Sequence, residues 1–166
     1  MKAIKYVKGD ATRPQGDGPK IIAHVCNSVG GWGAGFVLAV SKRWLGPERH
    51  YRQLKTYDLG ASYFIKVEPE LFVANMIAQS GYGNNNSNLH RSDEEDSRPP
   101  IRYDALRACL EQVAEKALEE NATVHMPRIG CALAGGKWSL VEPIIQETIS
   151  SEDIPVTVYD YGFFNP

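Results

Sequence analysis

The segment IIAHVCNSVGGWGAGFVLAV, residues 21–40, decides the fold that we expect for this chain. Its first part, residues 21–25, is a short apolar run, which is typical of a strand that is buried on both faces. A glycine-rich loop follows, and from Phe36 the apolar side chains recur with the period of a helix. The segment therefore predicts a buried strand, a glycine loop and an amphipathic helix in direct succession.

A second segment of the chain repeats this order. The strand candidate TVHMP at 123–127 precedes the glycine-rich loop RIGCALAGGKW at 128–138, and apolar residues from Leu140 onward have helical spacing with Leu140 inward. Ser139 and Glu142 match a capping box at the start of that helix. Loops that leave the carboxyl ends of parallel strands are common ligand sites, and their free backbone N–H groups suit phosphate oxygens. Two such loops predict a site that holds a diphosphate from two sides.

The rest of the chain alternates strand and helix patterns, which predicts an α/β fold with a mixed or mainly parallel sheet. Gly46-Pro47 should end the first helix, Asn121 should end a later one, and the polar stretch at about 81–100 should be a surface excursion of a single domain, 1–166. Further strands are expected at 2–7, 61–66, 71–77 and 155–161, and further helices at 48–56 and 106–117.

Composition narrows the class of partner. The chain has 166 residues, a length that fits one domain, and a formal net charge of −2. This charge argues against nucleic acid as a partner, because binding along a phosphate backbone needs a basic face. It does not exclude a small anionic ligand, because backbone amides can hold one. For the 15 glycines, the positions in the chain therefore matter more than the number.

The sequence also indicates the environment of the protein. We expect no membrane partner, because no apolar stretch approaches the ~18 residues of a membrane span, and the start of the chain does not resemble a secretory signal. The cysteines, Cys26, Cys109 and Cys131, are odd in number and form no CxxC pair, which fits a reducing cytoplasm. The histidines lack ligand-type spacing, so we expect no metal. We also expect no cofactor.

Three motifs together resemble the macrodomain family, the ADP-ribose-binding α/β/α module. They are YVKGDAT at 6–12, HVCNSVGGWGAGFVLAVSKRW at 24–44 and MPRIGCALAGGKW at 126–138. The resemblance spans nearly the whole chain and is nearest to the single-domain ADP-ribose-1″-phosphate processing enzymes and the terminal ADP-ribose protein glycohydrolases. It implies a three-layer α/β/α fold with a mixed, mainly parallel central sheet, and ADP-ribose or a derivative as the ligand.

The resemblance also implies roles for single residues. Asp10 would accept a hydrogen bond from the adenine amine, the Ala11 amide would meet a ring nitrogen, and Asn27 would hold hydroxyls of the distal ribose. The aromatic stacked on adenine would be Tyr159, Tyr161, Phe163 or Phe164, of which we choose Phe163. The diphosphate and distal ribose would lie between Gly33, Ala34, Gly35 and Phe36 on one side and Ile129, Gly130, Cys131, Ala132 and Leu133 on the other.

Several of these residues also have a plain structural interpretation. Asp10 could cap a turn, Asn27 could form one, and Cys131 fits a small packed residue better than a nucleophile. Trp32 could cover the distal ribose or pack on the surface.

His24 is the candidate catalytic residue. Phosphatase-type relatives carry a histidine at its place, three residues before the asparagine, and an imidazole suits acid–base or nucleophilic work on a 1″-phosphate. A histidine on a buried strand can equally be a satisfied core residue. The glycohydrolase-type relatives use a lysine and an aspartate that this chain lacks: Ala134 replaces the aspartate, and the strand around Asn75 has no lysine.

Two functions of different class thus stay open. The first is an enzyme that hydrolyses ADP-ribose-1″-phosphate or an ADP-ribosyl ester, and the second is a module that binds ADP-ribose without turnover. A surface for RNA or poly(ADP-ribose) is disfavoured by the charge balance. The oligomeric state is left open.

Overall fold

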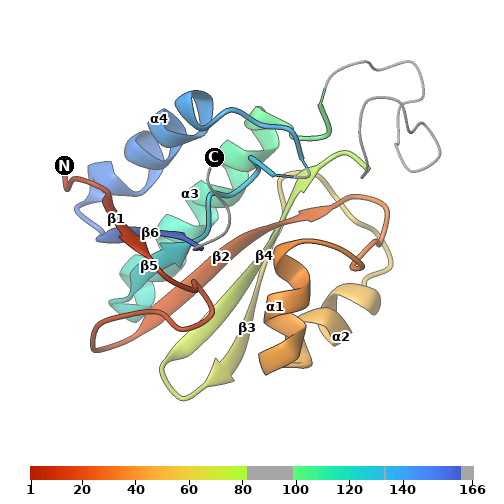
Figure 1. The fold of residues 1–166 in the computed structure, drawn as a ribbon, viewed down its shortest axis with the longest axis horizontal. Helices are drawn as coiled ribbons and strands as arrows, with labels where there is room; N and C mark the ends of the chain where they lie inside the picture. The colour runs from red at the N-terminus through yellow and green to blue at the C-terminus, as the bar shows by residue number, and fades with distance from the viewer. Residues whose placement is uncertain (82–98, 133, 162–166) are drawn as a thin grey trace.

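The computed structural model describes residues 1–81, 99–132 and 134–161 (Figure 1). Within these ranges, the strands form one six-stranded sheet in the order β1-β6-β5-β2-β4-β3. The strands are β1 (Lys5–Lys8), β2 (Lys20–Asn27), β3 (Ser62–Glu68), β4 (Leu71–Gln79), β5 (Thr123–Met126) and β6 (Val156–Asp160).

Strand direction fixes where the loops of this sheet lie. The pairs β1–β6, β6–β5, β5–β2 and β2–β4 are all parallel, and β3 runs antiparallel to β4. The predicted mixed, mainly parallel sheet is thereby confirmed. Since parallel strands end at the same edge, the segments that follow β1, β2, β4, β5 and β6 all leave one edge of the sheet.

The strand β2 lies between β4 and β5 and is covered on both faces. Ile21 and Ala23 belong to the hydrophobic core that includes α3 (Tyr103–Glu120) and α4 (Trp138–Thr148). Ile22 and Cys26 belong to the core on the opposite face. Alternating side chains therefore enter two cores, which explains why the strand reads as one continuous apolar run.

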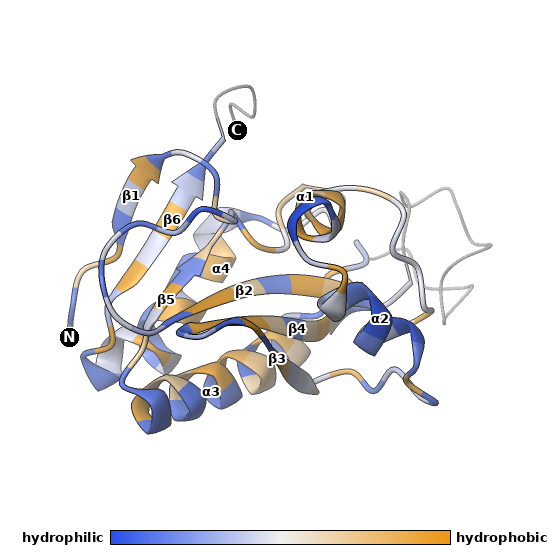
Figure 2. Cartoon of the chain, turned by 90° about the horizontal axis from the view of Figure 1, so that it is seen from below, coloured by the Kyte–Doolittle hydropathy of each residue, from blue (hydrophilic) through white to orange (hydrophobic). Residues whose placement is uncertain are grey.

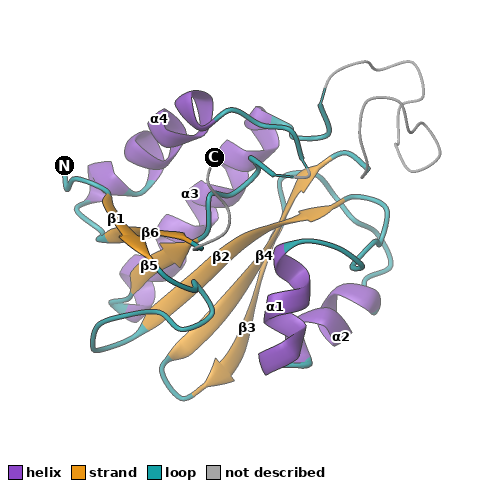
Figure 3. Ribbon diagram, viewed as in Figure 1, coloured by secondary structure: helices purple, strands orange, loops and turns teal. Residues whose placement is uncertain are grey.

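Helices complete the three layers. The core on the second face is closed by α1 (Phe36–Arg43) and α2 (Gly46–Arg52), through Val37, Val40 and Tyr51. Figure 2 shows α1 and α3 on opposite sides of the sheet, and Figure 3 shows the same arrangement by secondary structure. The predicted α/β/α architecture is confirmed. None of the helices that the structure describes is both long and apolar enough to cross a membrane.

Two helix boundaries differ from the prediction. Gly46 and Pro47 do not simply end the first helix; they begin α2, because a proline in the first turn of a helix lacks only an N–H that would have no partner there. Asn121 does end α3, in the left-handed conformation with φ 53°.

The predicted capping box is wrong. The helix α4 begins at Trp138, so Ser139 lies inside its first turn and makes no capping hydrogen bond. Leu140 is 49% exposed and not directed inward. The start of the helix is set by tertiary contacts, because the Lys137 N–H donates to the Tyr103 hydroxyl and the Trp138 ring packs against Tyr6.

The second glycine loop is closed by its own backbone. The Gly136 N–H donates to the Gly130 carbonyl oxygen at 2.7 Å. Gly130 and Gly135 have φ of +74° and +73°, a region that side chains disfavour. A Cβ on Gly136 would lie 2.4 Å from the Gly130 oxygen, well inside van der Waals contact.

We therefore expect Gly136→Ala to destabilise the fold by about 1–3 kcal/mol, the usual cost of forcing an extra carbon into a packed position. Urea unfolding measures the difference. Gly33→Ala is the control, because a Cβ there has no atom within 4 Å. Equal stabilities of the two variants would contradict this view of the loop.

Candidate functional site

Three segments predicted to bind the ligand lie at the carboxyl edge of the sheet. They are residues 9–13 after β1, residues 28–35 after β2, and residues 127–132 and 134–137 after β5. The strands β2 and β5 are neighbours, so their two glycine loops leave adjacent positions. The loops that leave β2 and β5 are drawn in teal in Figure 3. The topology therefore brings together loops that are about 100 residues apart in the chain.

Asn27 shapes the first of these loops. Its Nδ2 donates to the Gly31 carbonyl oxygen at 2.7 Å. Its Oδ1 accepts from the backbone N–H groups of Gly31 at 2.9 Å and Val29 at 3.1 Å. The Tyr51 hydroxyl lies 2.8 Å from the same oxygen and 2.6 Å from the Asn27 carbonyl oxygen. The asparagine thus acts as a turn former, and its contact with ribose hydroxyls stays a prediction.

The start of α1 offers backbone donors. Gly35 is the N-cap with φ 82° and ψ −150°, a conformation that favours glycine, and no side chain caps the helix. Gly33, Ala34 and Gly35 are exposed. The N–H groups of Phe36 and Val37 donate to no other described residue. The helix dipole adds positive potential at these donors, so this turn can bind an anion.

The turn after β1 carries Asp10 and Ala11. The Asp10 Oδ1 accepts from the Thr12 N–H at 2.8 Å and from the Thr12 hydroxyl at 2.7 Å. Asp10 therefore caps a turn, as its plain interpretation proposed. Its Oδ2 and the Ala11 N–H have no hydrogen-bond partner among the described residues, and Ala11 is 2% exposed. The adenine contacts that the resemblance implies stay a prediction.

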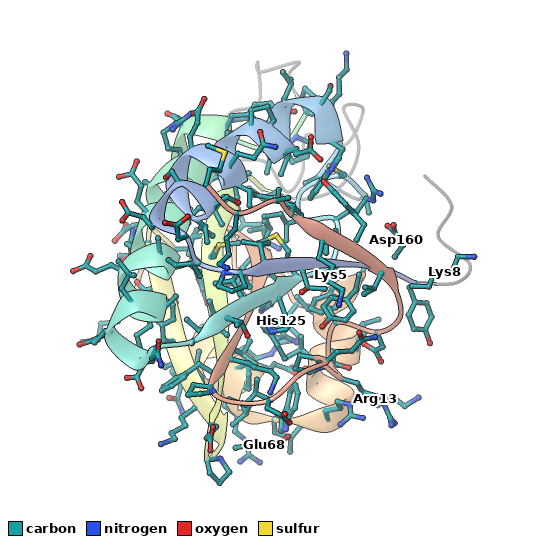
Figure 4. The ribbon with its side chains drawn as sticks, turned by 90° about the vertical axis from the view of Figure 1, so that its left-hand side faces the viewer. Lys5, Lys8, Arg13, Glu68, His125 and Asp160 are labelled. Carbon is teal, nitrogen blue, oxygen red and sulfur yellow. The ribbon has the colours of Figure 1, made fainter. Side chains whose placement is uncertain are left out.

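An arginine fixes the root of the second loop. Arg128 Nε donates to Asp160 Oδ1 at 2.7 Å, and its NH2 group donates to Oδ2 at 3.1 Å. Its guanidinium lies over the rings of Tyr6 at 5.2 Å and Trp138 at 5.1 Å. Asp160 ends β6 beside Lys8 at the end of β1 (Figure 4). The loop is thereby tied to β1, β6 and α4, and the ion pair lowers the pKa of Asp160.

The predicted wall residues of the second loop face different ways. Ile129 is 2% exposed and packs in the core, so only its backbone can meet a ligand. Gly130 and Cys131 are half-buried, and Ala132 is exposed. Burial raises the pKa of the Cys131 thiol to about 11, which keeps it neutral and fits a packed residue. Leu133 lies outside the described residues.

His24 is enclosed. It is 1% exposed, with its ring 5.6 Å from that of Trp32 and 5.7 Å from that of Phe36. Its Nε2 lies 2.6 Å from Asn75 Oδ1. Burial lowers the pKa of His24 to about 4, against a smaller raising effect of the Asn75 hydrogen bond. Its catalytic role stays a prediction, and in this structure the first loop and α1 cover it.

The aromatic residues considered for contact with the ligand differ in how far they are buried. Trp32 is 3% exposed, donates from Nε1 to the Ser41 hydroxyl and belongs to the core. Of its two alternatives, packing on the surface is therefore wrong, and a contact with the distal ribose stays a prediction. Tyr159 is 2% exposed, and its hydroxyl accepts from the Gln15 N–H and bonds His125 Nδ1. It is therefore held inside the fold. Tyr161 is 44% exposed. Phe163 and Phe164 lie outside the described residues, as does most of the stretch 81–100.

Sequence reasoning missed the residues that support these loops. Tyr51 is completely buried on α2, and Arg128 lies two residues after the end of β5. Their partners, Asn27 and Asp160, lie 24 and 32 residues away. The only sequence signal was that Arg128 opens the predicted loop. Among the described residues, no group of three or more His, Cys, Asp or Glu side chains is placed to hold a metal ion.

Comparison with known proteins identifies the family to which this fold and its glycine loops belong. No family model matches the chain. The chain is 48% identical to a macrodomain protein from Streptomyces coelicolor, with a TM-score of 0.79 over 96% of this chain and all of that one. The chain therefore belongs to the macrodomain family. It is 52% identical to a protein of unknown function from Bacteroides thetaiotaomicron, with a TM-score of 0.87 over 95% of this chain and 98% of that one.

Two curated proteins are more distant relatives. The ADP-ribose 1″-phosphate phosphatase of Meyerozyma guilliermondii is 23% identical over 165 residues, which cover 89% of this chain and 94% of that protein. The chromodomain-helicase-DNA-binding protein 1-like of Danio rerio is 29% identical over 171 residues. The chain spans 16% of the length of that second protein.

The two buried histidines predict a loss of stability in acid. Burial lowers the pKa of His24 and of His125 to about 4, with Lys20 as a smaller cause for His125 (Figure 4 labels His125). As pH falls from 6.5 towards 4, the unfolded chain binds protons that the folded chain does not, so stability falls. We expect the free energy of unfolding at pH 5 to be lower than at pH 7.5 by about 2 kcal/mol per histidine. Urea unfolding at the two pH values measures this difference. The stability of His125→Gln should depend on pH about half as strongly as that of the wild type. A wild-type stability that is the same at pH 5 and pH 7.5 would contradict the lowered pKa values of the two histidines.

The hydroxyl of Tyr51 should stabilise the first loop. In Tyr51→Phe, Asn27 loses that partner, so unfolding free energy should fall by about 0.5–1.5 kcal/mol and the Gly31 amide should exchange faster with solvent. Hydrogen exchange measured by NMR reports both changes. The control is Tyr57→Phe, because the Tyr57 hydroxyl donates to no described residue. If the control loosens Gly31 as much, the Tyr51–Asn27 contact does not shape the loop.

Proposed function

We propose that this macrodomain binds ADP-ribose or one of its derivatives at the carboxyl edge of its sheet and hydrolyses such a derivative, in the manner of an ADP-ribose-1″-phosphate phosphatase. The observation that carries the proposal is that the segments assigned to adenine, diphosphate and distal ribose lie at one edge of the sheet in a member of the family. The name of the Meyerozyma guilliermondii relative supports the same substrate class.

Backbone groups supply the proposed contacts with the diphosphate. Residues 28–36 include no charged side chain, and Arg128 is already paired with Asp160. The free N–H groups of Phe36 and Val37, at the positive end of α1, can donate to phosphate oxygens instead. This arrangement accounts for an anionic ligand on a chain whose net charge is −2.

At the other end of the ligand, Asp10 would select adenine. With Oδ1 committed to Thr12, its Oδ2 is the atom that can accept from the exocyclic amine, and the Ala11 N–H can donate to a ring nitrogen. A base with a keto group at that position would set one acceptor against another. The turn thus favours adenine over hypoxanthine.

Binding without turnover is the second candidate function, and the burial of His24 favours it. A histidine that is 1% exposed and covered by Trp32 and Phe36 touches no ligand unless its cover moves. The two candidates share the same binding site and differ only in turnover.

We also propose that residues 1–166 form one macrodomain and that the protein works in the cytoplasm. The sheet and both helical layers draw on elements from the start to the end of the described chain. Cys26 and Cys109 are buried free thiols, and Cys131 is a half-buried one, which supports a reducing compartment.

Calorimetry with ADP-ribose tests the binding site. In Asp10→Asn, only one side-chain oxygen remains. If this oxygen still accepts from Thr12, the amide NH2 faces the adenine amine, and two donors then oppose each other. We therefore expect the affinity for ADP-ribose to fall at least tenfold. Asp17→Asn, an exposed position of the same loop, is the matched control and should bind within twofold of wild type. No detectable heat from wild type with millimolar ADP-ribose would reject both functions, and equal affinities of the two variants would reject the role of Asp10.

Release of phosphate from ADP-ribose-1″-phosphate separates the two functions. If the protein is an enzyme that uses His24, wild type releases phosphate and His24→Ala does not, although the variant still binds ADP-ribose. If it binds without turnover, wild type binds the compound and releases nothing. A His24→Ala variant as active as wild type shows that hydrolysis does not use His24.

A further inference from the structure

Asn75 is the one side chain bonded to His24 among the described residues. The two are register partners on β4 and β2, and both side chains are directed to the layer of α1 and α2. Asn75 is completely buried, and its Oδ1 lies 2.6 Å from His24 Nε2. The sequence placed Asn75 near the end of a strand without giving it a role.

The hydrogen bonds of Asn75 fix the tautomer of His24. Asn75 Nδ2 donates to the carbonyl oxygen of Pro47 at 3.0 Å, and that oxygen can only accept. The other end of the amide, Oδ1, therefore faces His24, and it too can only accept. His24 Nε2 must carry the proton, so in the neutral ring the lone pair is on Nδ1.

The surroundings keep His24 neutral. The rings of Trp32 and Phe36 are packed around it. The buried titratable members of the same cluster are Cys26 on β2 and Tyr51 on α2, and the phenols of Tyr57 and Tyr63 pack against the cluster. Burial raises the pKa of Cys26 and of Tyr51, so neither carries charge near neutral pH. No charged side chain contributes to the lowered pKa of His24.

His24 Nδ1 is buried and has no hydrogen-bond partner among the described residues. A buried polar atom without a partner costs free energy, so it calls for an explanation. The unpartnered atom is also the one atom of the ring that can accept a proton. It lies under the first loop and the start of α1, which carry Trp32 and Phe36.

We propose that Asn75 is a positioning residue, which holds His24 in the Nε2–H tautomer so that Nδ1 acts as a general base in the hydrolysis. This inference rests on the proposed function. When Trp32 and Phe36 move aside, Nδ1 takes a proton from water as the water oxygen bonds to phosphorus. The bond from phosphorus to the O1″ of ribose breaks, and the proton passes from Nδ1 to O1″. The products are ADP-ribose and inorganic phosphate.

The first experiment needs no substrate. Two-dimensional 15N NMR of the histidine rings in the wild-type protein at pH 7 should show His24 with a protonated Nε2 and an unprotonated Nδ1. A proton on Nδ1, in the other tautomer or in the imidazolium ion, overturns the proposal. The same spectrum at pH 5 should be unchanged, because the pKa of His24 lies near 4.

The second experiment changes the partner. In Asn75→Asp, a carboxylate beside Nε2 favours the charged ring, so Nδ1 should be protonated at pH 7 in the NMR spectrum. We expect phosphate release to fall at least tenfold, with ADP-ribose affinity within twofold of wild type. Gln112→Glu makes the same chemical change on α3, on the opposite face of the sheet, and should leave both the tautomer and the rate unchanged.

The outcomes distinguish this inference from the proposed function. If wild type releases phosphate and Asn75→Asp releases it equally fast, Asn75 has no positioning role. If wild type binds ADP-ribose but releases no phosphate, the hydrolysis fails and the role of Asn75 in it fails too, whatever the tautomer. If Asn75→Asp does not fold, a wild-type tautomer with the proton on Nδ1 still overturns the proposal.

Discussion

The parallel pairing of β2 with both β4 and β5 is the constraint on which the rest of the structure depends. Because β2 is covered on both faces, its side chains alternate between two cores and its register cannot slip by one residue without turning each of them to the wrong face. Because it is parallel to both neighbours, the three strands end at one edge. The register of β2 with β4 places His24 opposite Asn75, and the pairing of β2 with β5 places the first glycine loop beside the second.

At this edge of the sheet, side chains support the loops, and backbone groups are left free for a ligand. Asn27, Tyr51 and Arg128 form hydrogen bonds within the protein, and these bonds hold the two loops in place. The groups left free are mainly backbone N–H groups, such as those of Phe36 and Val37. A site of this kind adds no formal charge, which reconciles a proposed diphosphate ligand with a net charge of −2.

Local patterns predicted the elements of the fold well. The apolar run at 21–25 and the helical period from Phe36 are properties of adjacent residues, and the left-handed turn at Asn121 needs only that residue type. The glycines likewise marked both loops. Parallel order followed from the alternation of strands and helices, since parallel strands require a crossover. The motifs of the family then supplied the candidate contacts with the ligand.

Features that depend on distant contacts were not predictable in this way. The start of α4 is set by Tyr103 and Tyr6, which no window around Ser139 contains. Trp32 sits in a glycine loop and still enters the core, because Ser41 accepts its N–H from within the same layer. The tautomer that we propose for His24 follows from Asn75, a residue 51 positions away. Such pairs arise only once the sheet has formed.

The central claim is that three separate segments at one sheet edge form a single site, and an amide NMR titration with ADP-ribose tests it most directly. Saturable shifts should appear together at Ala11, at Phe36 and Val37, and at residues 130–132, with one common dissociation constant. Shifts confined to the exposed surfaces of α3 and α4, or to one of the two glycine loops alone, would contradict the claim.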